Sequence, residues 1–470
     1  MAEHFKPVRY KPWELTLEER FKEYYAPLSE REATVEANRC LYCHDAPCMV
    51  ACPTHIDIPT FIRKISTGNV KGSAKTILES NLMAATCARV CPVEELCEGA
   101  CVVKHDMEKP IMIGRLQRYA MDYAADKKLK FFQQGKPNGK KVAVIGAGPA
   151  GLSCAGELAK LGFDVTVIER KDMAGGLSTY GIVVFREPVE VSLAEVKLIE
   201  ELGVKIKTNM TVGKDIMFEE IVDAYDAVFV AMGLGAVPEM EIPGEDLPGV
   251  VDGLEFIEET KVMPLDQIKY GNRVCIIGAG NTAIDCATIA RRLGADRVTM
   301  VYRRSEAEMP AYHFEYEFAL GEGVSFSFLT QPVEVVGNGK VEGLKCIRMD
   351  LGEPDASGRR SPVPVPNSEF VLPCDQVIKA IGQKKFSEAV ERLKQYGITT
   401  TKGYLDVDAG CKTSHAKIWA GGDCVRSKGE ASTVMAVQDG KLAAASIHRA
   451  LLGAPSPNED RLQPVLTPAK

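Results

Sequence analysis

The cysteines are the residues of this 470-residue chain whose number and spacing most clearly indicate chemistry. Eight of the fifteen fall in two blocks, Cys40-x2-Cys43-x4-Cys48-x3-Cys52-Pro53 and Cys87-x3-Cys91-Pro92-x4-Cys97-x3-Cys101. Thiolates are the expected ligands of iron–sulfur clusters, and Cys-Pro endings are typical of ferredoxin-type ligation. Zinc is the alternative, but the spacings lack the two paired Cys-x2-Cys knuckles of a zinc ribbon.

Two glycine-rich loops are the second chemical feature. One begins at Gly146 and the other, Gly278–Ala283, lies later in the chain; each follows a strand pattern and opens a helix pattern. In that context G-x-G-x-x-G binds a dinucleotide, because Gly146 allows the tight turn and Gly148 lets a pyrophosphate approach the free N–H groups of the helix. Glu169, at the end of the next strand, can accept hydrogen bonds from ribose hydroxyls.

The strand after the second glycine loop ends differently, in Tyr302-Arg303-Arg304. A carboxylate such as Glu169 would repel a 2′-phosphate, whereas two guanidinium groups would bind it. The second site is therefore predicted to prefer NADP to NAD. The alternative is a pair of arginines that are simply solvated.

Two nucleotide sites beside iron–sulfur clusters predict an electron relay. NADPH delivers two electrons at once as a hydride, while each cluster carries one electron. A flavin accepts a pair and releases electrons singly, so FAD belongs between them. The sequence thus predicts an NAD(P)H-dependent oxidoreductase.

The FAD site is assigned to the first glycine loop because the chain resembles flavoproteins that have two dinucleotide-binding domains. In that class a late strand ending in Gly-Asp, here Lys417–Asp423, returns to the FAD domain and places Asp423 near the ribityl chain. The helix that starts near Thr433 would direct its positive end at the flavin. The turns Ala231–Gly233 and Ala380–Gly382 resemble the paired crossover strands of the same class.

These sites require three domains to position them. The expected fold class is α/β, with an N-terminal α-helical iron–sulfur domain followed by two Rossmann-like dinucleotide-binding domains, of which the FAD domain is discontinuous. We assign residues 1–136 to the helical domain with two [4Fe–4S] clusters, 137–250 and 383–470 to the FAD domain, and 251–382 to the NADP(H) domain. The segment Glu353–Glu369, rich in proline, serine and charge, is expected to be an exposed loop.

Composition excludes several classes of protein. The net charge of −7 argues against binding nucleic acid, and 46% apolar residues argue against a disordered chain. Apolar runs are shorter than the roughly 20 residues that cross a bilayer, and the N-terminus has no signal-peptide pattern. We expect a soluble, cytoplasmic protein.

From about Ala33 to His448 the chain resembles the N-terminal half of dihydropyrimidine dehydrogenase and its separate bacterial NAD(P)-binding subunit. The similarity is carried by Cys40–Pro53, Cys87–Pro92 and Ile113–Arg118. The chain resembles the small subunit of glutamate synthase more distantly. The first resemblance implies one cluster on Cys40, Cys43, Cys48 and Cys101, and another on Cys52, Cys91, Cys97 and Gln117. Counting cysteines alone would put Cys87 in the place of Gln117, and spacing leaves both open.

The same resemblance implies the cofactor contacts. Those for FAD are Gly146, Ala147, Gly148, Pro149, Ala150, Glu169, Gly176, Leu177, Arg186, Val212, Gly422, Asp423 and Thr433. Those for NADPH are Ala279, Gly280, Asn281, Thr282, Arg303, Arg304, Ala380 and Gly382. Two departures stand out: Phe185–Pro188 reads Phe-Arg-Glu-Pro where the family has Phe-Arg-Leu-Pro, and the family's third basic residue near the 2′-phosphate has no match around Ala307.

The resemblance also implies a partner. The family reduces pyrimidines at an FMN in a (β/α)8 barrel, which typically needs about 250 residues beyond the three domains assigned here. The expected function is to pass electrons from NADPH, through FAD and two [4Fe–4S] clusters, to an FMN-containing iron–sulfur barrel subunit that reduces uracil or thymine to 5,6-dihydropyrimidines. Pyrimidine catabolism in a hetero-oligomer would follow, with no general acid or base for the final substrate on this chain. The alternatives are a glutamate synthase small (beta) subunit, a related NADPH:acceptor oxidoreductase, or a zinc-bearing regulatory protein that binds nucleotides.

Overall fold

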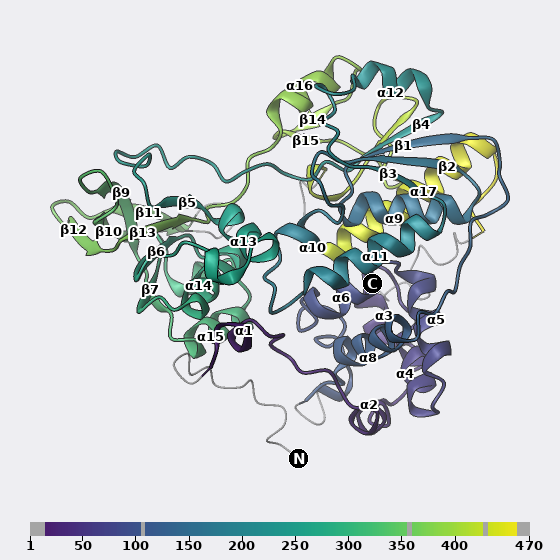
Figure 1. Ribbon diagram of the computed structural model, residues 1–470, viewed down its shortest axis with the longest axis horizontal. Helices are drawn as coiled ribbons and strands as arrows, with labels where there is room; N and C mark the ends of the chain where they lie inside the picture. The colour runs from purple at the N-terminus through teal and green to yellow at the C-terminus, as the bar shows by residue number, and fades with distance from the viewer. Residues whose placement is uncertain (1–14, 105–108, 355–359, 426–430, 458–470) are drawn as a thin grey trace. The chain divides into compact units, whose positions relative to one another are not determined.

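The computed structural model describes residues 15–104, 109–354, 360–425 and 431–457, and the chain forms two compact units. The first unit comprises the chain up to Tyr25, Tyr180–Pro188 and Gly235–Lys384. The second unit comprises Ala26–Thr179, Val189–Leu234 and the chain from Lys385 onward. Figure 1 shows the elements of each unit.

Short helices form the N-terminal part of the second unit (Figure 1). They begin at side-chain caps, such as Ser29 with Glu32 in a capping box and Asp57 accepting from the Thr60 N–H. Apolar residues at helical spacing, including Phe61 and Ile65, face the interior. The helices are α2 (Glu30–Ala37), α3 (Pro47–Ala51), α4 (Ile58–Ser66), α5 (Val70–Ser80), α6 (Ala84–Val90) and α8 (Ile113–Asp126).

A five-stranded parallel sheet in order β16-β4-β1-β2-β3 follows in the second unit. Its central strands are largely apolar and buried, as expected of a sheet covered on both faces. Because β16 comes from far along the chain, the discontinuous Rossmann-like domain is confirmed. The strands are β1 (Lys141–Ile145), β2 (Asp164–Ile168), β3 (Lys205–Lys207), β4 (Ala227–Val230) and β16 (Ile418–Ala420). The other elements of this part are α9 (Pro149–Lys160), α11 (Val189–Glu201), α12 (Phe218–Ala224), α16 (Ser387–Lys394), β14 (Thr400–Thr401), β15 (Tyr404–Leu405), η5 (Gly422–Cys424) and α17 (Thr433–Leu452), and α10 (Leu177–Tyr180) ends at the unit boundary.

The helices α9 and α17 lie side by side (Figure 1). Gly440 makes this approach possible, because a Cβ there would lie 2.3 Å from the Ala150 carbonyl oxygen. The Ser153 hydroxyl donates to the Val437 carbonyl oxygen at 2.8 Å and fixes the contact. The late helix is thereby held against the helix that opens at the first glycine loop.

The first unit contains a second parallel sheet, in order β5-β13-β6-β7-β8. The strands beside the two glycine loops therefore belong to separate sheets, and the predicted α/β fold class is confirmed. The two crossover segments lie against each other, and the Gly235 N–H donates to the Lys384 carbonyl oxygen at 2.7 Å. The strands are β5 (Val250–Asp252), β6 (Arg273–Ile277), β7 (Arg297–Val301), β8 (Ser325–Ser327) and β13 (Gln376–Lys379), and the helical elements are α1 (Leu17–Arg20), α13 (Gly253–Val262), η3 (Leu265–Gln267), α14 (Asn281–Leu293), η4 (Glu306–Glu308) and α15 (His313–Gly321).

An antiparallel sheet is inserted between β8 and β13. It consists of β9 (Thr330–Val336), β10 (Gly343–Pro354), β11 (Arg360–Pro364) and β12 (Phe370–Pro373). The prediction of an exposed loop over 353–369 is wrong for β11, which pairs with β10. Its prolines read as breakers in the sequence, but β11 is an edge strand, where a residue without an N–H is tolerated.

Residues 15–25 belong to the first unit, although the sequence places them with the helical domain. Phe21 is buried in the apolar core of the first unit, and the Arg292 guanidinium donates to the Arg20 carbonyl oxygen at 2.8 Å. The Tyr24 N–H donates to the Phe185 carbonyl oxygen at 2.7 Å. This segment has no strong periodic pattern, so its docking partner is decided by tertiary contacts.

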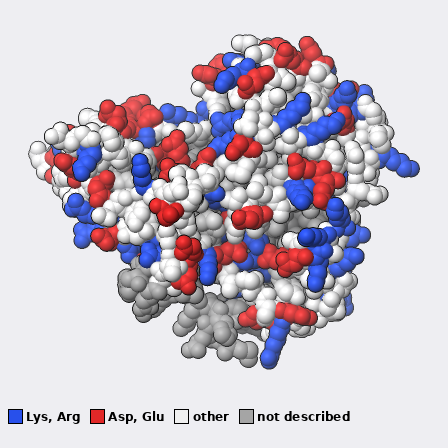
Figure 2. All heavy atoms as spheres, in the orientation of Figure 1, with Lys and Arg blue, Asp and Glu red and all other residues white. Residues whose placement is uncertain are grey.

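Two observations bear on partners and membranes. Among the residues that the structure describes, no helix combines the length and apolarity needed to cross a bilayer. Figure 2 shows acidic and basic side chains interspersed on the face in view, without the continuous basic field that nucleic-acid binding uses.

Candidate functional site

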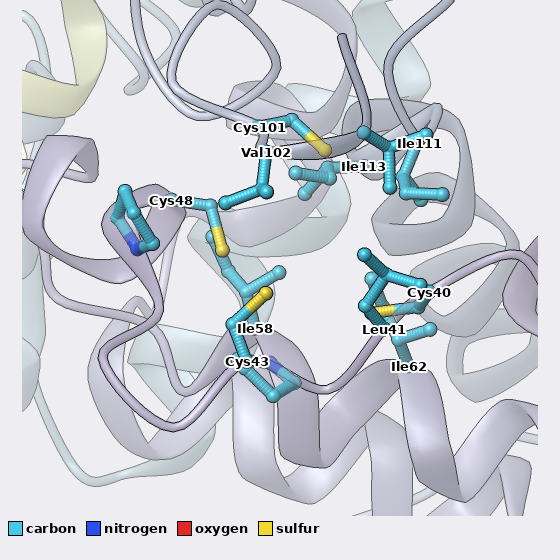
Figure 3. Close-up of a pocket in the computed structure, with 13 residues that line it drawn as sticks. Cys40, Leu41, Cys43, Cys48, Ile58, Ile62, Cys101, Val102, Ile111 and Ile113 are labelled. Carbon is cyan, nitrogen blue, oxygen red and sulfur yellow. The ribbon is translucent and has the colours of Figure 1, made fainter. Parts of the chain in front are cut away.

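Four cysteines from the two blocks line one pocket in the second unit. Figure 3 shows the sulfur atoms of Cys40, Cys43, Cys48 and Cys101 around a shared space. The rest of the lining is mainly apolar and includes Ile58, Ile62, Ile111 and Ile113. This is the set that the family resemblance assigns to the first cluster.

The loop that carries three of these thiols is tightly wound. Tyr42 and Ala46 have left-handed backbone, with φ of 51° and 26°. The Tyr42 hydroxyl donates to the Ser66 hydroxyl at 3.0 Å, which ties the loop to α4. Pro47 then opens α3 and places Cys48 in its first turn. Such strained backbone persists only where the surroundings hold it, and it clusters at binding sites.

A second set of thiols gathers around α6. The thiols of Cys91 and Cys87 are hydrogen-bonded, and this contact, burial, and the nearby Cys52 and Cys97 thiols raise the pKa of Cys91 well above its usual range. Burial and the Cys52 thiol likewise raise the pKa of Cys97. Local structure brings Cys87 and Cys91 close together, because Cys87 lies on α6 and Cys91 is the residue at which this helix ends.

Gln117 is the ligand that the resemblance implies in the place of Cys87. It is buried on α8, and its amide nitrogen donates to the Ala84 carbonyl oxygen at 2.8 Å. The structure brings Cys87 into contact with the Cys91 thiol, and the role of Gln117 as a ligand stays a prediction. The signal for Cys87 was present in the sequence, since eight cysteines divide into two sets of four.

The arrangement of the thiols indicates which inorganic group they could hold. Within the described residues, no three His, Cys, Asp or Glu side chains lie close enough together to bind a single metal ion. Since four thiols nevertheless share one pocket, their spacing favours a multinuclear iron–sulfur cluster over zinc. Burial raises the pKa of Cys48 to about 12, so binding a metal would displace protons from such thiols.

The first glycine loop leaves room for a dinucleotide. Gly146 has φ of 100°, and a Cβ there would lie 2.4 Å from the Ala231 carbonyl oxygen. Gly148 faces open space, because an added Cβ would meet only Gly176, at 3.9 Å. The start of α9, at Pro149 and Ala150, is therefore accessible to a pyrophosphate. Ala147 is buried beneath the loop.

Glu169 lies beside this loop. One carboxylate oxygen accepts from the Ala147 N–H at 2.8 Å, and the other accepts from the Lys171 N–H at 2.9 Å. Two backbone donors thus fix the carboxylate at the carboxyl end of β2, where a ribose would lie. Of the other residues predicted to contact FAD, Leu177, which follows Gly176, is 41% exposed. Val212, in the same unit, is half-buried.

The late Gly-Asp turn also meets this site. Gly422 has φ of 76°, and a Cβ there would lie 3.1 Å from that of Ala150. Its N–H donates to the Asp439 carboxylate at 2.9 Å. Asp423 follows on the same turn, and Thr433 opens α17 after the Ser432 cap. The structure therefore brings predicted residues of the first glycine loop, α9 and η5 together.

Arg186 is placed in the first unit with carboxylate partners that the sequence analysis missed. Its guanidinium forms a two-pronged ion pair with Glu315, and Asp285 lies 3.6 Å away. Burial raises the pKa of Asp285 to about 7, partly offset by Arg186. The expected FAD contact of Arg186 stays a prediction, whereas its buried ion pair is a structural feature.

The second glycine loop repeats the geometry of the first. Gly278 has φ of 127°, and a Cβ there would lie 2.2 Å from the Ala380 carbonyl oxygen. Gly280 has open space beside it, with Pro310 at 4.0 Å. Asn281 accepts from the Tyr312 N–H at 3.2 Å, while Ala279 is buried and Thr282 half-buried. Gly382 has φ of 103° and nothing within 4 Å of its would-be Cβ.

Two arginines follow β7, at the carboxyl end of the second sheet. Arg303 is exposed, and it has no hydrogen bond or ion pair with any other residue that the structure describes. The Arg304 Nε donates to the Arg360 carbonyl oxygen at 3.1 Å. Arg360 lies on β11, and nothing in the sequence pattern connects it to β7.

Two models of known protein families match this chain. Residues 17–129 match the family model described as dihydropyrimidine dehydrogenase domain II, 4Fe-4S cluster, and residues 129–440 match pyridine nucleotide-disulphide oxidoreductase. The expected 4Fe-4S domain and nucleotide-binding oxidoreductase module are confirmed, whereas the identity with the pyrimidine enzyme is not.

Two curated relatives and one solved structure define the similarity further. The small chain of glutamate synthase [NADPH] from Escherichia coli is 38% identical over 446 residues, which are 91% of this chain and 93% of that protein. The NADPH-Fe(3+) oxidoreductase subunit beta from Geobacter sulfurreducens is 42% identical over 72% of this chain and 51% of that protein.

FprA from Mycobacterium tuberculosis, solved in complex with NADPH, matches the fold with a TM-score of 0.56 at 20% identity, over 70% of this chain and 90% of that one. The chain belongs to the pyridine nucleotide-disulphide oxidoreductase family, with a 4Fe-4S domain of the dihydropyrimidine dehydrogenase type ahead of the nucleotide-binding module.

Proposed function

We propose that the protein is an NADPH-oxidising flavin and iron–sulfur subunit that passes electrons to a partner. The observation that carries the proposal is the presence of two open glycine loops on separate sheets together with two sets of four thiols. FAD, when bound, takes up an electron pair and releases electrons singly. The residues of this chain hold and orient the groups.

Each site has its own task in this proposal. Arg303 and Arg304 bind the 2′-phosphate of NADPH, and Glu169 holds the FAD ribose. One [4Fe–4S] cluster is held by Cys40, Cys43, Cys48 and Cys101. The other is held by Cys52, Cys87, Cys91 and Cys97, with Gln117 in a structural role.

The partner is proposed to be a large chain of the glutamate synthase type. Relatives named as glutamate synthase small chains are matched over nearly their whole length, which supports this choice over pyrimidine reduction. The contact between Cys87 and Cys91 supports a second cluster held by four thiolates, which would not need the glutamine ligand implied by the pyrimidine enzyme. Reduction of uracil or thymine by an FMN barrel partner becomes the second candidate, supported by the description of the 4Fe-4S family model.

Anaerobic titration of the purified protein tests the first part of the proposal. NADPH should bleach the flavin band near 450 nm and the broad iron–sulfur absorption. If one of the two absorptions stays unbleached with NADPH, the proposed relay is excluded. Combination with the glutamate synthase large chain of the same organism should then give NADPH-dependent glutamate formation from glutamine and 2-oxoglutarate. NADPH oxidation that instead requires uracil and a barrel subunit would favour the second candidate.

A further inference from the structure

We propose that Arg360 is the third basic residue of the 2′-phosphate site and sets its preference for NADPH. The inference rests on the proposed NADPH site and names a residue that neither the glycine-loop motif nor the family pattern around Ala307 indicates. Its basis is the position of β11, which the inserted antiparallel sheet brings beside the end of β7.

The backbone of Arg360 is fixed by one of the two predicted arginines. The Arg304 Nε donates to the Arg360 carbonyl oxygen at 3.1 Å, although the two residues are 56 positions apart. Arg303 precedes Arg304 directly, so three guanidinium groups belong to one small region at the carboxyl end of β7. In doubly wound folds this end of the second strand is where the ribose and its 2′-substituent lie.

A carboxylate orients the Arg360 side chain. The Arg360 Nε and Nη2 atoms lie 3.1 Å and 2.9 Å from the same oxygen of Glu308. The other oxygen of Glu308 accepts from the N–H of Ser305 at 3.2 Å and from its hydroxyl. Hydrogen bonds from Ser305 and the nearby Arg360 lower the pKa of Glu308, so it is ionised at neutral pH.

The pairing leaves Arg360 able to bind an anion. A guanidinium has five N–H donors in a planar fork, and Glu308 uses two of them. No residue that the structure describes accepts from its Nη1 atom, and the side chain is 44% exposed. Arg360 therefore has two effects on a phosphate: it neutralises the Glu308 carboxylate, and it offers a further donor edge. NADH, which has no 2′-phosphate, gains from neither.

The test compares Arg360→Gln with Arg297→Gln. Arg297 is exposed at the opposite end of β7, so the control removes the same charge from the first unit, away from the proposed site. Binding of 2′,5′-ADP and of 5′-AMP is measured by calorimetry, and KM and kcat are measured with NADPH and NADH. Arg360→Gln should weaken 2′,5′-ADP binding and raise the NADPH KM roughly tenfold or more, as expected for one charge-assisted contact. Values for 5′-AMP, NADH and kcat should stay within about twofold, and Arg297→Gln should change none of them.

Equal losses with both nucleotides, or none, would overturn the role of Arg360. The double variant Glu308→Gln/Arg360→Gln separates the two effects. If it binds 2′,5′-ADP as tightly as the unaltered protein, Arg360 only neutralises Glu308 and is not a phosphate ligand. If it stays weak, the direct contact is supported. An unaltered protein that binds 2′,5′-ADP no better than 5′-AMP would instead refute the proposed NADPH site itself.

Discussion

Glu195 and Thr86 are joined by a buried hydrogen bond in which the Thr86 hydroxyl donates to the Glu195 carboxylate at 2.6 Å. The N–H groups of Ala85 and Thr86 donate to the same side chain at 2.6 Å and 3.2 Å. Glu195 lies on α11, within the FAD-type domain, and Thr86 immediately precedes Cys87 on α6. One carboxylate therefore connects the nucleotide-binding domain to the helix that begins the second set of thiols.

This connection predicts a pH-dependent stability. Burial raises the pKa of Glu195 to about 7, against the hydrogen bonds that lower it. The folded state therefore holds a proton that the unfolded state, with a carboxyl pKa near 4.5, releases earlier. The stabilising contribution is complete below about pH 4.5 and is lost as the pH rises through about 7, with a total of roughly 3 kcal/mol.

Glu195→Gln should remove that part of the pH profile. Melting temperatures between pH 5 and 8 should fall less steeply in the variant than in the unaltered protein. Glu201→Gln is the control, because Glu201 is exposed on the same helix. A Glu195→Gln profile parallel to that of the unaltered protein would show that Glu195 does not titrate in this range.

Much of the fold was accessible from sequence because its signals are local. The strands β1, β2, β6 and β7 are short, largely apolar runs beside the glycine loops, and the structure has a strand before each loop as the sequence predicts. The contacts of Cys87 and Arg360 are different, since each depends on how distant elements pack. A resemblance assigned Gln117 to the second cluster by its position along the chain; the packing of α6 against α8, which sequence does not show, places its amide nitrogen against the Ala84 carbonyl oxygen.

Exchange of Cys87 tests the proposed second cluster. Cys87→Ser should lower the iron and acid-labile sulfide content by about half, because serine replaces one thiolate of a four-thiolate site. Gln117→Leu should retain full iron content, with a loss of stability from the missing bond to Ala84. Iron and sulfide analysis with electron paramagnetic resonance of the reduced protein measures both. The reverse pattern, loss with Gln117→Leu and retention with Cys87→Ser, would restore the ligand set implied by the pyrimidine enzyme.

Glu169 is predicted to control FAD retention. Glu169→Gln replaces one of two acceptor oxygens with an NH2 group, which would face the N–H of Ala147 or Lys171. A lost acceptor for a buried donor costs about 1–3 kcal/mol, so FAD affinity should fall at least several-fold. Flavin absorbance per protein after gel filtration measures this. Asp164→Asn, at the other end of β2, is the control and should keep its FAD; equal FAD loss in both variants would assign the effect to β2 as a whole.

Substitution of Gly440 by alanine separates the effect of helix packing on stability from the effect of helix propensity. Alanine is favoured over glycine in a helix interior by about 1 kcal/mol, so propensity alone predicts that Gly440→Ala stabilises α17. A Cβ at this position would instead lie 2.3 Å from the Ala150 carbonyl oxygen and 2.8 Å from the Cys154 nitrogen. Overpacking of this kind costs about 1–3 kcal/mol, and it would separate α17 from the start of α9. Gly440→Ala should therefore lower the melting temperature and the FAD content.

Gly321→Ala provides the matched comparison, since a Cβ on this residue of α15 meets nothing within 4 Å. That variant should leave the melting temperature unchanged or raise it. Thermal unfolding followed by circular dichroism, with flavin fluorescence as the second signal, measures both variants. A stabilised Gly440→Ala protein that retains FAD would show that α9 and α17 can separate without loss of the site, and the close approach of the two helices would then not be what holds the Gly-Asp turn over the first glycine loop.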